Sequence, residues 1–263
     1  MILVLAGTQD GREIAAKLAL QQKEEILAST VSEYGGQLAA CEHLKVLVGK
    51  LDKTAMKDVI LEQHISLLID ATHPYAIKAS ETAREVCRET GIPYCRYERP
   101  AVALPDYGKL VEVASADEAA KVAAKLGQVI FLTTGSRTLG TFAKESLLKE
   151  KRLIARVLPD PEVLTECFEL GFTPQNIIAM QGPFSQKLNK AMFAECGAEV
   201  VVMKNSGTIG GSDTKLLAAM ELSLFLVVIT RPPLLSTDYP LFSKQEEVIM
   251  WAADKNVAMD RRC

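Results

Sequence analysis

Short apolar segments alternate with amphipathic segments along nearly the whole chain, and no other feature constrains the fold as much. The apolar segments are continuously hydrophobic rather than alternating, which is typical of parallel strands buried on both faces. Strands that alternate with helices in this way predict an α/β fold with mainly parallel sheets. The expected strands are Ile2–Ala6, Glu25–Thr30, Lys45–Val48, Ser66–Asp70, Tyr94–Tyr97, Lys109–Val113, Val129–Thr133, Leu153–Val157, Asn176–Met180, Val200–Met203 and Leu224–Ile229.

The segment Arg99–Lys109 divides these strands into two series. It contains two prolines and a glycine and has no helical period, so it is the best candidate for a domain boundary. We expect an N-terminal domain at 1–100, a C-terminal domain at 105–240, and a last helix at 243–254 that packs back on the body. The helices expected between the strands include Gly11–Gln22, Thr54–Glu62, Ala76–Thr90, Asp117–Lys125, Pro161–Leu170 and Ser185–Cys196.

The composition excludes several classes of protein. The net charge of −3 gives no general attraction to nucleic acid or to an anionic membrane. The longest apolar run, Leu222–Ile229, is far shorter than the ~20 residues that span a bilayer, and no secretory leader is expected. The six scattered cysteines form no C-x-x-C pair and only three histidines are present, so no metal site is expected. We expect reduced, mostly buried thiols in a cytoplasmic protein.

The first strand leads into the sequence "GTQDGREIA", which begins at Gly7. Gly7 and Gly11 allow a close backbone approach, and Thr8 and Asp10 can cap the following helix. The exposed amides of a helix start attract anions, and the guanidinium of Arg12 suits phosphate. The first strand-to-helix turn is the usual nucleotide contact in doubly wound sheets, so phosphate binding is the favoured interpretation. The alternative is a tight turn with a capped helix.

The end of the second expected strand bears hydroxyl groups and no acid. NAD-binding domains usually place a carboxylate there to bind the ribose, whereas this chain has Ser29, Thr30 and Ser32. Hydroxyls without a carboxylate suit a 2′-phosphate and favour NADPH over NADH. The alternative is that these are ordinary turn residues.

Polar and titratable groups also follow the fourth and fifth strands. Asp70, His73 and Tyr75 lie in "DATHPYA", directly after an apolar strand. The carboxyl ends of parallel strands form the ligand face of such a sheet, although a single histidine is often a structural hydrogen-bonding group. Arg96 and Arg99 in "RYERP" could meet substrate carboxylates or pair with acids of the protein.

Three further polar turns each follow a strand of the second series, and in a parallel sheet they would face the same side. They are "TTGSR" at Thr133–Arg137, "QGPFS" at Gln181–Ser185 and "KNSGTIGGSDTK" at Lys204–Lys215. Glycines beside lysine and arginine indicate a large, anionic, oxygen-rich ligand. "TTGSR" also resembles the first turn of the chain, so the phosphates of a cofactor could be shared between the two turns or lie mainly on the second.

The ordered set of these turns, together with "RVLP" at Arg156–Pro159, resembles the precorrin-6A reductases, including the cobalt-precorrin-6A form. The resemblance extends from about Ile2 to Pro232 and departs from the family at Thr208, where a second glycine is frequent. It implies two Rossmann-like domains with an interdomain cleft. It also implies an NADPH-dependent reduction of a tetrapyrrole macrocycle in cobalamin biosynthesis.

The resemblance assigns roles to the residues of the turns. Any proton would come from His73, Tyr75, Asp70 or water. Arginines and lysines of the turns would bind the carboxylates of the macrocycle. The expected cofactor-binding residues are Gly7, Thr8, Asp10, Gly11, Arg12, Ser29, Thr30, Thr134, Gly135, Ser136 and Arg137. The expected substrate-binding residues are Arg96, Arg99, Gln181, Ser185, Lys204, Asn205, Ser206, Gly207 and Lys215.

Two other functions are compatible with glycine-rich turns in an α/β chain. One is an S-adenosylmethionine-dependent methyltransferase of tetrapyrrole metabolism, which would normally have an acid at the second strand. The other is a non-enzymatic NAD(P)H sensor, which would not need the polar turns of the second domain. The choice between a cobalt-containing and a metal-free substrate stays open, with a slight preference for cobalt. The oligomeric state also stays open.

Overall fold

The computed structural model describes residues 1–21, 25–31, 33–39, 44–233 and 238–260. Ser32, Cys41 and Cys263 lie outside these ranges. The described chain forms two compact units. The first unit comprises Met1–Pro100 together with Pro233–Cys263, and the second comprises Ala101–Pro232. The chain therefore enters the second unit after Pro100 and returns to the first after Pro232.

The first unit is built on a six-stranded, fully parallel sheet in the order β12-β5-β4-β1-β2-β3. The strand order 3-2-1-4-5-6 is that of the Rossmann fold. The sixth position is taken by β12, a two-residue strand from the far end of the chain that was not predicted from sequence. The strands are β1 (Ile2–Leu5), β2 (Ile26–Thr30), β3 (Leu44–Val48), β4 (Leu67–Asp70), β5 (Tyr94–Tyr97) and β12 (Leu241–Phe242).

Helices cover both faces of this sheet. Ile14 and Leu18 of the first helix pack with Val248 and Ala252 of the last helix against one face. Residues of the third and fourth helices, such as Met56, pack against the other face. The helices are α1 (Gln9–Gln21), α2 (Glu33–Ala39), α3 (Lys53–Glu62), α4 (Ile77–Thr90) and α10 (Gln245–Asp260).

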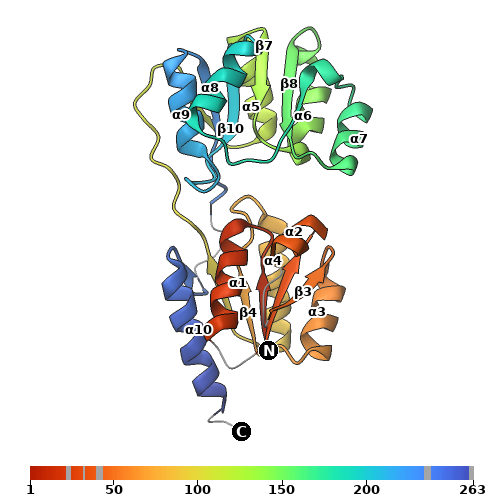
Figure 1. Ribbon diagram of the computed structural model, residues 1–263, viewed down its shortest axis with the longest axis vertical. Helices are drawn as coiled ribbons and strands as arrows, with labels where there is room; N and C mark the ends of the chain where they lie inside the picture. The colour runs from red at the N-terminus through yellow and green to blue at the C-terminus, as the bar shows by residue number, and fades with distance from the viewer. Residues whose placement is uncertain (22–24, 32, 40–43, 234–237, 261–263) are drawn as a thin grey trace. The chain divides into compact units, whose positions relative to one another are not determined.

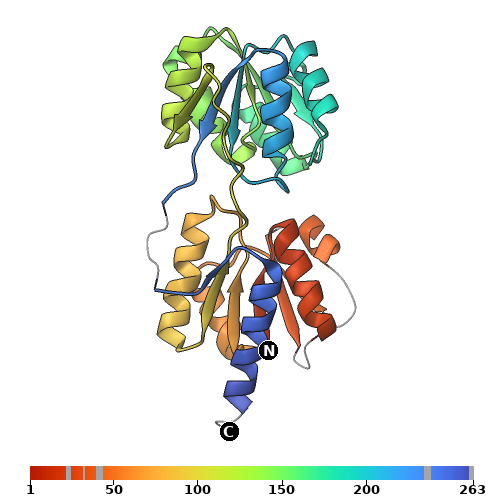
Figure 2. The same ribbon diagram turned by 90° about the vertical axis from the view of Figure 1, so that its left-hand side faces the viewer.

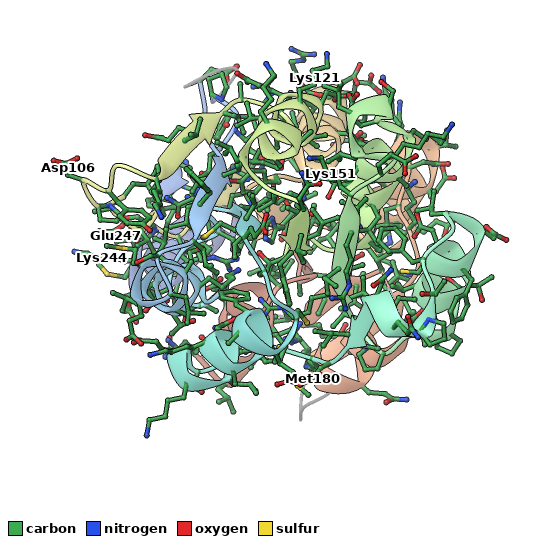
Figure 3. All side chains as sticks on the ribbon, turned by 90° about the horizontal axis from the view of Figure 1, so that it is seen from above. Asp106, Lys121, Lys151, Met180, Lys244 and Glu247 are labelled. Carbon is green, nitrogen blue, oxygen red and sulfur yellow. The ribbon has the colours of Figure 1, made fainter. Side chains whose placement is uncertain are left out.

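The last helix, α10, packs beside α1 within the first unit (Figures 1 and 2). Gln245 accepts a hydrogen bond from Lys17 at 2.8 Å and donates one to Glu13 at 2.8 Å. Lys244 and Glu247 are labelled near each other in Figure 3, and Lys244 Nζ lies 3.9 Å from Glu247 Oε1 at the start of this helix. The last segment of the chain is therefore part of the first unit.

The second unit has the strand order β9-β8-β7-β10-β11-β6, and its sheet is also fully parallel. This is again the 3-2-1-4-5 Rossmann order, with the sixth position taken by a strand that precedes the others in the chain. The strands are β6 (Leu110–Val113), β7 (Val129–Leu132), β8 (Arg152–Val157), β9 (Ile177–Ala179), β10 (Val200–Lys204) and β11 (Phe225–Ile229).

Phe193 of the eighth helix and Leu216 of the ninth pack against Phe131 and Ile154 on one face of the second sheet. The fifth helix packs against β10 and β11. The helices are α5 (Ala116–Leu126), α6 (Leu139–Lys144), α7 (Pro161–Glu169), α8 (Gln186–Glu195) and α9 (Ser212–Glu221), with short 3-10 turns at Ser136–Thr138, Ser146–Leu148 and Pro174–Asn176. The predicted α/β class with parallel sheets is confirmed.

Each sheet has one point where the direction of its connections reverses, and ligands of α/β proteins bind at the carboxyl end of the strands there. In the first unit this point lies between β1 and β4, where "GTQDGREIA" and "DATHPYA" begin. In the second unit it lies between β7 and β10, where "TTGSR" and "KNSG" begin. The two turns with similar sequences therefore occupy equivalent positions in two sheets of the same order.

Candidate functional site

Thr8 joins the two sides of the reversal point in the first unit. Its Oγ1 accepts a hydrogen bond from the Gly11 amide at 3.0 Å and donates one to the Ala71 carbonyl at 2.9 Å. The first bond caps α1, as predicted, and the second ties the turn to the end of β4. The start of α1 is thereby fixed against the neighbouring strand.

The two glycines of this turn have different surroundings. A Cβ atom at Gly11 would lie 2.8 Å from the Ala6 Cα atom and 3.2 Å from the Ala71 Cβ atom, so only glycine lets the helix start this close to the sheet. A Cβ atom at Gly7 would meet nothing within 4 Å, and Gly7 is exposed. The backbone at Gly7 is therefore open to a ligand, which fits the phosphate of a nucleotide.

Asp10 and Arg99, predicted to contact cofactor and substrate respectively, form an ion pair with each other. Both side chains are buried, and the Tyr97 hydroxyl also donates to Asp10 Oδ1 at 3.3 Å. Asp10 therefore faces a cation of the protein, and Arg99 neutralises an acid that would repel phosphate at the start of α1. The structure thus gives both groups a partner within the protein, and their contact with ligands stays a prediction.

Asp70 and Arg96 form a second buried ion pair, at 2.7 Å. Asp70 also accepts hydrogen bonds from the Tyr94 hydroxyl at 2.8 Å and the Thr72 amide at 3.0 Å. Arg96 is further paired with Glu98 at 3.0 Å. Burial alone would raise the pKa of Asp70, but Arg96 and the hydrogen bonds outweigh burial and hold it below the ordinary value. Arg96 is only 3% exposed, and its bonds to Asp70 and Glu98 order this loop; its contact with substrate stays a prediction.

His73 and Tyr75 are the partly buried members of the same loop. The Tyr75 amide donates to His73 Nδ1 at 3.3 Å, and the two ring centroids lie 5.6 Å apart. With Nδ1 accepting, the proton of a neutral imidazole is carried by Nε2. The loop therefore keeps two groups with transferable protons beside the reversal point.

The remaining candidates of the first unit differ in accessibility. Ser29 and Thr30 are 7% and 1% exposed, because they lie within β2 rather than in the turn after it. Arg12 is half-buried, and no carboxylate of the described residues lies within ion-pair distance of it. Arg12 is thus the cation of this turn that is available to an anion, while the two hydroxyls are largely enclosed.

In the second unit, the turns after β7 and β10 are joined by a lysine. Lys204 Nζ donates to the Thr134 carbonyl at 3.1 Å. Gly135 has a φ of +79°, and Arg137 lies exposed on the same turn. Burial, and secondarily the charge of Arg137, lowers the pKa of Lys204. Two cations near an open glycine turn are the arrangement expected for an anion site.

The segment after Lys204 is held largely by its own hydrogen bonds. The Ser206 amide donates to Ser212 Oγ at 3.0 Å, and Ser212 Oγ donates to the Lys204 carbonyl at 3.2 Å. Gly207 has a φ of +84°, and Lys215 is 7% exposed. The backbone of this loop is therefore prearranged, while Ser206 and Lys215 are mostly enclosed.

Asn205, predicted to bind substrate, holds the segments through which the chain enters and leaves the second unit. Its side chain accepts from the Val102 amide at 3.0 Å and donates to the Val102 carbonyl at 2.7 Å. Its carbonyl accepts from Arg231 Nε at 2.9 Å. A structural role explains this residue without a ligand.

Gln181 and Ser185 of the "QGPFS" turn are both exposed, and Ser185 caps α8 by accepting from the Leu188 amide at 3.2 Å. Arg156 is buried and lies against the Phe184 ring of this turn, and the sequence assigns it no individual role. The signal available was an arginine in the otherwise apolar end of a strand.

Within the described ranges, no cluster of three or more His, Cys, Asp or Glu side chains could hold a metal ion. No helix there is long and apolar enough to cross a membrane. Cys87, Cys95 and Cys167 are buried and Cys196 is half-buried, all as free thiols, in agreement with the prediction for these four.

Comparison with known proteins gives a consistent result. The cobalt-precorrin-6A reductase of Priestia megaterium is 40% identical over 251 residues, covering 95% of this chain and 96% of the relative. That of Methanothermobacter thermautotrophicus is 38% identical, covering 88% and 76%. The precorrin-6A reductase of Mycobacterium tuberculosis is 29% identical, covering 96% and 97%.

A solved structure described as CobK precorrin-6A reductase superposes with a TM-score of 0.78 at 27% identity, covering 97% of this chain and 96% of that one. The family model described as precorrin-6x reductase CbiJ/CobK matches residues 1–253. This match includes both sheets, both reversal points and most of α10. The chain belongs to the precorrin-6x reductase CbiJ/CobK family.

Proposed function

We propose that this protein catalyses the NADPH-dependent reduction of cobalt-precorrin-6A, by hydride transfer to the macrocycle, in cobalamin biosynthesis. The observation that carries the proposal is the family match over residues 1–253, which spans both units. The cobalt form is favoured over the metal-free form because the relatives that are 40% and 38% identical bear the cobalt name, whereas the relative with the metal-free name is 29% identical. The four described free thiols are compatible with a cytoplasmic enzyme.

Membership of a reductase family implies a nicotinamide cofactor, and the residues at the reversal points fit one. Gly7 leaves the backbone open, Gly11 permits the close helix start, and Arg12 supplies a cation. In the second unit, Gly135 and Arg137 offer an equivalent turn with Lys204 beside it. The bound cofactor would supply the hydride, so the protein has to bind, orient and exclude water. Its phosphates would rest on one turn or be shared by both.

The proton that completes the reduction would come from His73, Tyr75 or water. His73 Nε2 carries a proton when its Nδ1 accepts from the Tyr75 amide. Asp70 is unsuited to donate a proton, because its pKa is held below the ordinary value and it is fully buried. We assign Asp70 and Arg96 the role of positioning this loop.

The decisive experiment is to follow NADPH oxidation with cobalt-precorrin-6A and with precorrin-6A side by side. We expect oxidation with the cobalt form to be faster, and NADPH to bind more tightly than NADH. Arg12→Ala should weaken NADPH binding about tenfold, the value of one charge-assisted contact. Arg88→Ala, an exposed arginine of α4 in the same unit, is the matched control. Absence of NADPH oxidation with either macrocycle would refute the proposal.

A further inference from the structure

Arg156 is a buried cation at the carboxyl end of β8, the strand next to β7 in the second sheet. It is only 8% exposed. No Asp or Glu of the described chain lies within ion-pair distance of it, whereas Arg96 and Arg99 are each paired with a carboxylate. Burial lowers the pKa of Arg156 to about 10, without a contribution from any charged neighbour. A desolvated charge with no counterion costs stability, so its presence needs an explanation.

The guanidinium of Arg156 is held in one orientation. Its Nη1 donates to Asn189 Oδ1 at 2.7 Å, and its Cζ atom lies 4.4 Å from the centroid of the Phe184 ring. The same Cζ atom lies 5.7 Å from the centroid of the Phe131 ring. Aromatic faces attract a cation and fix the plane of the group, but they do not neutralise its charge.

Asn189 is itself locked. Its amide nitrogen donates to the Phe184 carbonyl at 3.2 Å, to the Ser185 carbonyl at 3.1 Å and to Thr214 Oγ1 at 3.3 Å. The amide oxygen of Asn189 is therefore the atom left to face Arg156. A side chain that is 1% exposed and has this many partners is a built support, and it ties Arg156 to the "QGPFS" turn.

Two donor groups of the guanidinium are uncommitted. Nε and Nη2 donate to no acceptor in the described structure. Among the described residues, Asp213 Oδ1 is the side-chain polar atom that is both fully buried and without a partner. Nε and Nη2 also lack a partner, so they are not fully buried and remain accessible to solvent. Nε and Nη2 form the edge of the guanidinium that binds the two oxygens of a carboxylate or phosphate. The Nε and Nη2 edge of Arg156 is therefore a fixed, charged donor pair with no carboxylate of the described residues beside it.

We propose that Arg156 binds an anionic oxygen group of a ligand, a phosphate monoester or a carboxylate, at the carboxyl edge of the second sheet. The position favours a phosphate monoester. In NADP-binding Rossmann domains an arginine near the end of the second strand accommodates the 2′-phosphate, about 20 residues after the glycine turn. In the second unit that strand is β8 and the turn contains Gly135. In the first unit the corresponding strand, β2, ends in Ser29 and Thr30, whose side chains are largely enclosed.

The identity of the ligand rests on the proposed function, since the cofactor's 2′-phosphate and the carboxylates of the macrocycle are the two available sources. The test measures the dissociation constants of NADPH and NADH and the KM of cobalt-precorrin-6A for the wild type and Arg156→Gln. Glutamine keeps an N–H donor for Asn189 and removes the charge. Arg152→Gln, an exposed arginine at the other end of β8, is the matched control.

If the phosphate is the ligand, Arg156→Gln weakens NADPH binding about tenfold or more and changes NADH binding less than about twofold. If a carboxylate is the ligand, the KM of the macrocycle rises by a similar factor and both cofactor constants stay the same. Unchanged binding and an unchanged KM in a folded variant would overturn the proposal. Arg156→Lys, which keeps the charge without the fork, replaces Arg156→Gln if the latter does not fold, and it should weaken the same ligand.

Stability separates a ligand role from a purely structural one. The melting temperature of ligand-free Arg156→Gln should equal or exceed that of the wild type, because an uncompensated buried charge has been removed. A lower melting temperature with unchanged affinities would assign Arg156 to structure alone. If the wild type fails to oxidise NADPH, the proposed function fails, and inorganic phosphate then tests Arg156 by itself: the phosphate-induced rise in melting temperature should be smaller in the variant.

Discussion

Replacing Asp70 with asparagine removes the charge at the centre of the buried network in the first unit. The fully buried carboxylate accepts from Arg96, Tyr94 and the Thr72 amide. Asparagine has one acceptor oxygen in place of two, and its NH₂ group would face donors. Breaking a buried ion pair by removing one partner costs about 3–5 kcal/mol. Because Glu98 remains 3.0 Å from Arg96 as a counterion, we expect the lower end, about 3 kcal/mol.

For a chain of this size a loss of 1 kcal/mol lowers the melting temperature by about 2–4 °C, so Asp70→Asn should lower it by about 6–12 °C at pH 7. Calorimetry and circular dichroism measure this for the transition of the first unit. Asp58→Asn, on the exposed side of α3, should change it by less than about 2 °C.

The pH dependence follows from the lowered pKa of Asp70. A carboxyl whose folded pKa is depressed stabilises the protein above its unfolded pKa of about 3.9, and this contribution is lost as the pH falls through the folded value. The difference in stability between wild type and Asp70→Asn should therefore shrink below about pH 4. A difference under about 1 kcal/mol at pH 7, or one that stays constant down to pH 3, would refute the assignment of a charged, stabilising Asp70.

Three further substitutions test the turns. Gly11→Ala should destabilise the first unit by about 1–3 kcal/mol in urea unfolding, because the new Cβ atom would lie 2.8 Å from the Ala6 Cα atom. Gly7→Ala should leave stability unchanged and weaken NADPH binding, because a Cβ atom there would meet nothing within 4 Å. Equal stabilities of the two variants would contradict this reasoning. Asn205→Ala removes two hydrogen bonds to the Val102 backbone and should lower the free energy of unfolding by about 1–3 kcal/mol. Proteolytic cleavage near Val102 should become faster. An unchanged cleavage rate would argue against the structural role of Asn205.

The fold class and the positions of the turns could be read from the sequence because their signals are local. Continuous apolar segments identified eleven of the strands, and glycines identified the turns at the carboxyl edges of both sheets. Periodicity missed β12, because two residues are too short to show a period and the strand is held by its pairing with Arg96 and Tyr97.

The sequence by itself determined an α/β chain whose polar, glycine-containing turns follow buried strands, and it indicated the reductase family. Only the tertiary structure decided which charges of those turns are available. Asp10 and Arg99 are 89 residues apart in the chain, and Asp70 and Arg96 are 26 apart. Asp70 and Arg96 meet because β5 pairs with β4. Asp10 and Arg99 meet because the chain at and after the end of β5 contacts the start of α1. The same long-range packing encloses Arg156 without a carboxylate, since burial and pairing depend on neighbours in space that spacing along the chain does not specify.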